Sequence, residues 1–364
     1  MSEVPLVPAG LEVCVIGYGV AGHLHESLMR DWGARVSVVE AGSVADPPAR
    51  LWSSLDRLPW PDRVDVWSVC TPTDAHLSTV RAILGRCPDA RLIVEKPLCR
   101  PGELEEFAAL LSAHPSARLV LVDHYRYAAA PKALSRLRAE TVGYAPVSAV
   151  RVSFTKDRRA DAATGRFVDR AFGVFGYEWL HMIACLRGAL SPAQFAEYLA
   201  TPVDDCELRV GTDEDLVPNA ARETTRLSDG CEVDLFSTVV GAAPGGPVPP
   251  AWVADHGVGP GGRQRLLQVE SAATLFTVEF DPVADPVGQS LGRNVHRLSV
   301  RRGGHRSRWI VHDSPMGTAL ASALATLSAR RGDFDPRPMH RLRALAERAV
   351  AVAAAAAHPV QEPA

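Results

Sequence analysis

The sequence has no excess of positive charge, no long apolar run near its start and no paired cysteines. Its 39 Lys and Arg against 42 Asp and Glu give a net charge of −3, so we expect no nucleic acid or membrane surface as partner. The first apolar run, 11–16, is far shorter than the roughly 20 residues of a membrane span, and no basic region precedes it. The seven cysteines form no C-x-x-C pair and no metal-binding spacing, which favours reduced thiols, no metal site and a cytoplasmic location.

A glycine-rich turn follows the first apolar strand. Residues 11–22 read L-E-V-C-V-I-G-Y-G-V-A-G, and the segment 23–32 after them suits a helix. In this order the three glycines can turn the chain, let the backbone approach a pyrophosphate, and let the helix and the strand pack closely. The helix N-terminus then offers free N–H groups to the phosphates. The pattern predicts a dinucleotide site formed by Gly17, Tyr18, Gly19, Val20, Ala21 and Gly22.

An acidic residue ends the second expected strand, 34–39. Glu40 lies 23 residues beyond Gly17, close to the spacing of about 20 at which a carboxylate binds the adenosine ribose. It would repel a 2′-phosphate, and residues 41–43 supply no arginine to hold one. We therefore expect NAD rather than NADP as the cofactor. The alternative is that Glu40 only closes the strand at the surface.

Two further expected strands, 64–70 and 91–94, also end in polar residues. In an open parallel sheet, ligands bind outside the carboxyl ends of the strands. The residues after these strands should therefore lie near the cofactor, and Pro97 would fix the turn that aims the lysine. The expected cofactor contacts are Thr71, Pro72, His76, Glu95 and Lys96.

Four motifs in order resemble those of the glucose–fructose oxidoreductase and inositol dehydrogenase (Gfo/Idh/MocA) family. They are G-Y-G-V-A-G (17–22), T-P-T-D-A-H (71–76), E-K-P (95–97) and D-H-Y-R-Y (123–127). The resemblance covers the first third of the chain well and the remainder loosely. It implies an α/β fold, with an N-terminal Rossmann domain followed by an α+β domain that has a large, mostly antiparallel sheet. It also implies hydride transfer between a nicotinamide cofactor and a ring carbon of a sugar or cyclitol, by a homo-dimer or homo-tetramer.

The resemblance also sets the expected domains and substrate contacts. We expect the NAD-binding domain over 1–125, a substrate and oligomerisation domain over 126–336, and a C-terminal helix and tail over 337–364. The E-K-P lysine of the family contacts the reacting oxygen, which assigns that role to Lys96. Within D-H-Y-R-Y, Tyr125 and Arg126 are assigned to the substrate.

A helix expected over 177–186 carries the second catalytic element that the resemblance implies. The family pattern is D-x-x-x-H after a glycine-rich turn, and here Y-E-W-L-H places His181 at the histidine and Tyr177 at the aspartate. Because neighbours on a helix are three and four residues apart, both Tyr177 and Glu178 can lie beside His181. A histidine suits proton transfer at neutral pH, and a carboxylate beside it would stabilise its protonated form. The structural alternative is a buried histidine on an apolar helix.

The pattern after about residue 145 changes to alternating strands. A loop is expected over 241–264, and a final helix over 339–357. The expected strands are 147–154, 232–240, 265–269 and 274–280, with a hairpin of 295–300 and 307–311 that turns at 302–304.

A basic cluster follows the strand 147–154. It comprises Lys156, Arg158, Arg159, Arg166 and Arg170. These residues could bind an anionic substrate such as a sugar phosphate, with Lys156 as the first contact to test. The alternative is a solvated loop in which Asp157, Asp161 and Asp169 balance the charge.

The sequence thus favours an NAD-dependent dehydrogenase or ketoreductase that acts on a ring hydroxyl of a sugar, sugar phosphate or cyclitol. Because Tyr177 replaces the family aspartate, a reductase of an imine or non-sugar carbonyl is an alternative. A nicotinamide-sensing regulator without turnover is another, and the presence of both Lys96 and His181 argues against it.

Overall fold

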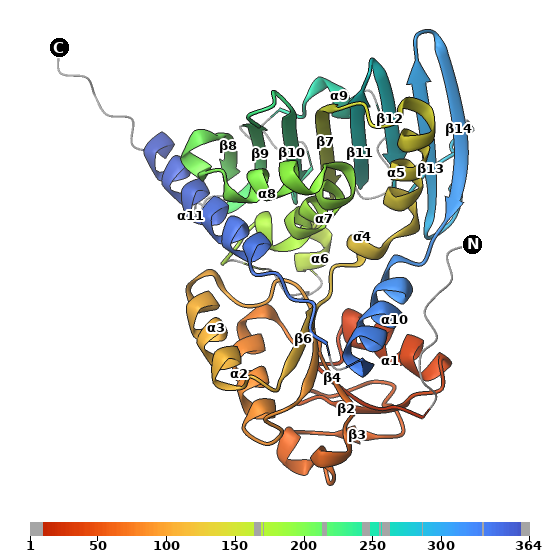
Figure 1. Ribbon diagram of the computed structural model, residues 1–364. Coiled ribbons are helices and arrows are strands. Elements are labelled where there is room, and N and C mark those ends of the chain that lie inside the picture. The colour runs from red at the N-terminus through yellow and green to blue at the C-terminus, as the bar shows by residue number, and fades with distance from the viewer. Residues whose placement is uncertain are drawn as a thin grey trace, which may run out of the picture. The chain divides into compact units, whose positions relative to one another are not determined.

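The computed structural model describes residues 10–163, 169, 171–212, 217–241, 248–254, 256, 263–285, 287–329 and 331–357. The chain divides into two compact units, whose elements are labelled in Figure 1. The first unit consists of Met1–His124 and Met316–Pro336, and the second of Tyr125–Pro315 and Arg337–Ala364. Within the described ranges, every helix is too short or too polar to span a membrane.

The first unit is a parallel six-stranded sheet in the order β3-β2-β1-β4-β5-β6. This is the doubly wound order of dinucleotide-binding domains. Its strands are β1 (Glu12–Ile16), β2 (Arg35–Val39), β3 (Leu51–Trp52), β4 (Val66–Val69), β5 (Arg91–Val94) and β6 (Arg118–Leu121). Its helices are α1 (Val20–Asp31), α2 (Thr73–Leu84), α3 (Leu104–Ala113) and nearly all of α10 (Pro315–Ser328).

Helix α10 belongs to the first unit although it begins 194 residues after the end of β6 (315 − 121). Its residues Leu320, Leu324 and Leu327 are fully buried in one core with Val13 and Ile93. The expected middle domain, 126–336, therefore differs from the observed division, because residues 316–336 bury their apolar side chains in the first unit. A local pattern of apolar residues could not show which sheet this helix covers.

The second unit is built on an eight-stranded sheet in the order β14-β13-β12-β11-β7-β10-β9-β8. All neighbours run antiparallel except β7 and β10, which run parallel. The strands are β7 (Val147–Thr155), β8 (Glu207–Thr212), β9 (Pro218–Arg226), β10 (Glu232–Thr238), β11 (Gln264–Ser271), β12 (Thr274–Glu279), β13 (Val295–Arg302) and β14 (His305–His312). The expected fold class, a Rossmann domain followed by a large mostly antiparallel sheet, is confirmed.

Helices cover one face of this large sheet, as Figure 1 shows. Helix α5 contacts β12 and α7 contacts β7, over the buried side chains of Val152, Phe276 and Val278. The helices of this unit are α4 (His124–Tyr127), α5 (Ala129–Val142), α6 (Arg159–Ala163), α7 (Leu180–Ala189), α8 (Pro192–Ala200), α9 (Ala251–Ala254) and α11 (Arg337–Ala357).

A buried ion pair joins α11 to β9. The Arg341 guanidinium donates to Glu223 Oε1 at 2.5 Å, and the Tyr198 hydroxyl donates to Glu223 Oε2 at 3.1 Å. All three side chains are almost fully buried. Strands β8 and β9 were not expected from the sequence, because E-L-R-V-G-T and P-N-A-A-R-E-T-T-R lack a long apolar run. The other expected strands of this unit agree with the structure to within three residues at each end.

Candidate functional site

The glycine turn between β1 and α1 is packed so closely that side chains cannot replace two of its glycines. A Cβ on Gly17, whose φ is +88°, would lie 2.7 Å from the Thr71 nitrogen. A Cβ on Gly22 would lie 2.0 Å from the Gly17 carbonyl oxygen, whereas one on Gly19 would meet only open space. Helix α1 begins at Val20, which is 71% exposed, and no side chain in the described part of the chain caps its first N–H groups. These free donors and the open backbone fit the pyrophosphate of a dinucleotide.

Glu40 lies against the same turn. Its carboxylate accepts the Tyr18 N–H at 2.7 Å and the Gly42 N–H at 2.8 Å, so it joins the loops after β1 and β2. The carboxylate is thus held close to the backbone that would face the adenosine end of a dinucleotide. Its expected contact with the adenosine ribose stays a prediction.

The turn after β4 presents a hydroxyl and a histidine. The Thr71 Oγ1 atom is buried and has no hydrogen-bond partner within the described part of the chain, which fits a contact to a bound cofactor. His76 Nε2 lies 2.8 Å from the Thr71 carbonyl oxygen, and Nδ1 lies 2.9 Å from the Pro97 carbonyl oxygen. Burial lowers the pKa of His76, and its two ring nitrogens tie the Thr71-Pro72 turn to the loop after β5. These contacts give His76 a supporting role; its expected contact with the cofactor stays a prediction.

The E-K-P segment that follows β5 is held by a buried histidine. His25 Nε2 lies 3.0 Å from Glu95 Oε1, and Glu95 Oε2 accepts the Lys96 N–H at 3.3 Å. On its other side, His25 Nδ1 lies 2.8 Å from Ser68 Oγ and 3.3 Å from Cys70 Sγ. Burial lowers the pKa of His25, but Cys70 and the Glu95 carboxylate outweigh it and raise the pKa to about 10.

His25 was not among the residues expected from the sequence. The signal was there, because His25 lies on the buried face of α1 with Gly22, Glu26 and Met29. A histidine on such a face needs a hydrogen-bonding partner, but a single helix cannot show that the partner is Glu95, 70 residues away.

In the second unit, His181 lies in an aromatic cluster. Its ring packs edge-on against Tyr125, with ring centroids 5.2 Å apart, and only 4% of the residue is exposed. Tyr125 also packs edge-on against Phe154 and Phe280, at 4.9 and 5.0 Å. Burial raises the pKa of Tyr125, so its hydroxyl stays protonated at neutral pH. The structure thus brings together Tyr125 and His181, which the sequence assigned to substrate and catalysis.

The helix that carries His181 starts differently from the expectation. Residues Phe175–Trp179 form a π-helical turn, and the α-helix α7 begins only at Leu180. Gly176 lies within this turn and is closely packed: a Cβ there would lie 2.4 Å from Asp169 Oδ2. The α-helical spacing that we expected from residue 177 is therefore wrong for its first turn. Single π-helical turns occur often at functional sites.

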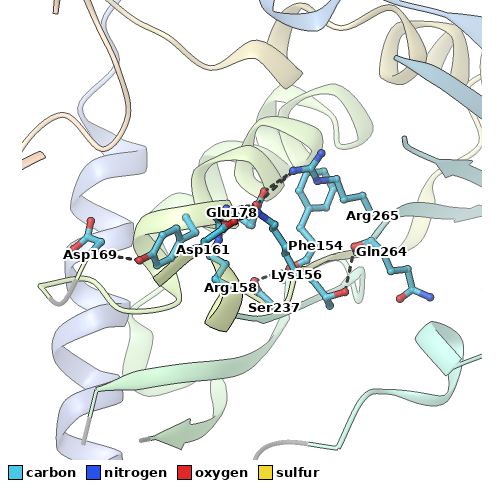
Figure 2. Close-up of polar contacts among 11 residues, drawn as sticks. Phe154, Lys156, Arg158, Asp161, Asp169, Glu178, Ser237, Gln264 and Arg265 are labelled. Atoms are coloured by element: carbon cyan, nitrogen blue, oxygen red, sulfur yellow. Dashed lines mark hydrogen bonds and ion pairs between the residues drawn. The ribbon is translucent and has the colours of Figure 1, made fainter. Parts of the chain in front are cut away.

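Glu178 is buried between two arginines. Its carboxylate accepts from Arg158 at 2.9 Å and lies 3.4 Å from Arg265, and Figure 2 shows these contacts. Burial lowers the pKa of Arg265, but Tyr125 and Glu178 outweigh it and the net shift is upward. The Tyr177 hydroxyl accepts the Asp169 N–H at 2.7 Å, and the Arg158 guanidinium lies 4.3 Å from the Tyr177 ring centroid.

The basic cluster is partly paired. Lys156 and Arg158 both form ion pairs with Asp161, and the exposed Arg159 pairs with Asp157. Arg166 and Arg170 lie outside the described residues. Arg265, which was not among the expected residues, adds a largely buried guanidinium beside this cluster (Figure 2). Arg126 lies with its guanidinium 5.4 Å from the Tyr127 ring centroid.

The parallel sheet and its glycine turn define the first unit as a dinucleotide-binding domain. Residues 11–124 match the model of an oxidoreductase family described as having an NAD-binding Rossmann fold, GFO_IDH_MocA. Residues 11–124 therefore belong to the Gfo/Idh/MocA family, and the resemblance seen in the motifs is confirmed. The protein is an NAD(P)-dependent oxidoreductase.

Solved structures share the fold over nearly the whole chain. UDP-N-acetylglucosamine 3-dehydrogenase GnnA from Acidithiobacillus ferrooxidans is 16% identical with a TM-score of 0.63, and the match covers 96% of this chain and 98% of that one. The 3-ketoreductase KijD10 from Actinomadura kijaniata, in complex with NADP and TDP-benzene, is 13% identical with a TM-score of 0.65 and coverage of 95% and 96%. GenD2 from gentamicin A biosynthesis, in complex with NAD, is 17% identical with a TM-score of 0.60 and coverage of 98% of both chains. No curated protein sequence matches the chain.

Proposed function

We propose that the protein transfers hydride between NAD and a ring secondary alcohol or ketone of a sugar, sugar phosphate or cyclitol. The observation that carries this proposal is the buried His25–Glu95 contact, which holds the E-K-P segment and its lysine at the end of β5. The family match and the fold shared with GnnA, whose name describes a dehydrogenase of a nucleotide sugar, support the substrate class.

In this proposal Lys96 and His181 act on the same substrate oxygen. The Lys96 ammonium would donate a hydrogen bond to that oxygen, which favours the negative charge that develops there. The His181 imidazole would take the hydroxyl proton in the direction of oxidation and return it in reduction. When bound, the nicotinamide supplies the hydride acceptor or donor. Tyr125 would fix the His181 ring through their edge-on contact.

The residues that would hold the cofactor lie in the first unit. The backbone N–H groups at the start of α1 would bind the pyrophosphate, and Glu40 would accept hydrogen bonds from the adenosine ribose. Glu40 would also repel a 2′-phosphate, so we propose NAD as the preferred cofactor. Thr71 Oγ1 would supply a further hydrogen bond.

Arg158 and Arg265 suggest an anionic substituent on the substrate. They share the buried carboxylate of Glu178, and Arg158 and Lys156 share that of Asp161, so these three cations and two carboxylates carry a surplus positive charge. Glu178 and Tyr177 then position basic residues instead of standing in directly for the family aspartate. Lys156 extends the same basic surface, and its ion pair with Asp161 would have to rearrange for it to bind a phosphate.

A panel of substrates tests the proposal. Purified protein with NAD would be assayed by nicotinamide absorbance against neutral polyols, sugar phosphates and nucleotide sugars, and with NADH against imines. Turnover confined to ring alcohols supports the proposal, and turnover only with imines contradicts it. Tight NAD binding with no turnover on any member favours a regulator. We also propose a cytoplasmic homo-dimer or homo-tetramer, which light scattering and cell fractionation would test.

A further inference from the structure

The face of the large sheet opposite α5 and α7 carries a concentration of arginines at β13 and β14. In an antiparallel pair, residues directly opposite each other point to the same face. Arg301 lies opposite Arg306 and Ser299 lies opposite Arg308, so these residues share one face. The next residues along, such as Val300 and Leu298, are buried on the other face.

The facing pair Arg301 and Arg306 lacks a matching pair of carboxylates. Like charges directly opposite each other destabilise a sheet. On β12 the residue opposite Arg301 is Leu275, and within the described ranges Arg301 forms no ion pair. The nearest carboxylate to Arg306, that of Glu279, is 3.7 Å away and forms a closer pair with Arg297 at 3.0 Å. Burial and the neighbouring Arg308 lower the pKa of Arg306.

A cavity of about 470 Å³ opens beside this pair. Arg301 and Arg306 line it with the hydroxyls of Ser299 and Thr277 and the apolar side chain of Leu275. Its volume is within the range of small-molecule sites. Farther along it are Trp252, His256 and Gln268, together with Arg151 and Glu270, which form an ion pair with each other at 3.2 Å.

We propose that this cavity binds a small organic phosphate, with its phosphate group between Arg301 and Arg306. The two guanidinium groups and the two hydroxyl groups are hydrogen-bond donors, and a phosphate group has more oxygens to accept from them than a carboxylate has. A phosphate dianion also matches the two positive charges of Arg301 and Arg306. The phosphate group fills only part of the cavity, and the organic part lies toward Trp252 and Gln268. This site is independent of the hydride-transfer proposal, because none of its residues is assigned to that reaction.

Calorimetric titration of the full chain with inorganic phosphate, at low salt and saturating NAD, tests the site. Saturating NAD excludes phosphate from the dinucleotide site. We expect Arg301→Gln and Arg306→Gln each to weaken phosphate binding by about tenfold or more, because each removes a charge-assisted hydrogen bond. Acetate should bind more weakly than phosphate to the unaltered protein.

Arg302→Gln is the matched control, because Arg302 is the next residue of β13, is exposed, and faces the other side of the sheet. It should leave phosphate binding unchanged. Equal weakening by Arg302→Gln would reveal a general charge effect and overturn the proposal. So would unchanged binding in both site variants, or a change of oligomeric state in them without a change in phosphate binding, since the arginines would then serve a contact between copies. Thermal unfolding without phosphate checks the fold, and both site variants should be at least as stable as the unaltered protein.

Discussion

His25 and Glu95 form a buried contact of 3.0 Å that supports the residue next to it in the sequence, Lys96. Because His25 is fully buried, its protonated ring is stabilised by the negative charge of the Glu95 carboxylate. The ionised form of Glu95 is stabilised by His25 in turn. Burial raises the pKa of Glu95, but the hydrogen bond and the charge of His25, together with the charge of Lys96, outweigh burial and the net shift is downward.

The first prediction concerns the pH dependence of this pair. The pKa of His25 is raised from 6.5 to about 10, so its contribution to stability is complete below pH 6.5 and is lost as the pH rises through about 10. The contribution of Glu95, whose pKa is lowered from 4.5, is present above that pH and is lost in acid. We expect His25→Gln to reduce the free energy of unfolding by about 3 kcal/mol at pH 6. In denaturant unfolding, the difference in the free energy of unfolding between His25→Gln and the unaltered protein should become smaller above pH 10.

His23→Gln is the control for this series, because His23 is an exposed histidine on the same helix. It should change stability by less than about 0.5 kcal/mol at either pH. A gap for His25→Gln that is the same at pH 6 and pH 10.5 would show that the ion pair is not its cause.

The second prediction concerns the choice of cofactor. Glu40→Ala removes the negative charge that is held against the glycine turn by the Tyr18 and Gly42 N–H groups. We expect the ratio of NADP to NAD affinity to rise by about tenfold or more, since one charge–charge repulsion is lost. Fluorescence titration of both cofactors measures the ratio. Equal or tighter binding of NADP by the unaltered protein would contradict the assignment of NAD.

The third prediction concerns Lys96. Lys96→Ala removes the donor proposed for the reacting oxygen, and we expect kcat to fall by about 10²–10³-fold. NAD affinity should fall much less than kcat, because Lys96 is only one of the expected cofactor contacts and the glycine turn and Glu40 remain. Lys96→Arg keeps the charge but changes the shape of the donor, and it should recover only part of the loss. Turnover that survives both changes with every accepted substrate would remove Lys96 from the mechanism.

The first unit could be predicted well because its signals are local. Strands β1, β2, β4 and β5 are apolar runs that each end in a motif or an acidic residue, whereas the two-residue β3 was not expected. The glycine spacing has a single structural use. The second unit could be predicted less well, since β8 and β9 carry few apolar residues and are held by buried polar contacts such as Arg341 with Glu223. The candidate functional residues show the same difference. Gly17, Glu40 and Lys96 were expected from motifs. His25 and Arg265 were not, because each contacts an expected residue, Glu95 or Glu178, that is distant in the sequence.

The last prediction concerns Glu178, for which the sequence left open a role beside His181. The structure places its carboxylate between Arg158 and Arg265, with 3% of the Glu178 side chain exposed. Glu178→Gln keeps the shape but removes the carboxylate that Arg158 and Arg265 share, so that Arg158 keeps only its longer ion pair with Asp161. We expect a loss of about 3–5 kcal/mol in the free energy of unfolding.

Glu232→Gln is the matched control, since it removes a carboxylate from a more exposed pair with Arg226, and it should cost less than about 1 kcal/mol. If an anionic substrate binds at Arg158 and Arg265, such a ligand should raise the unfolding temperature of Glu178→Gln more than that of the unaltered protein. The reason is that the ligand then supplies the missing negative charge. Equal shifts in the two proteins would place the anion elsewhere.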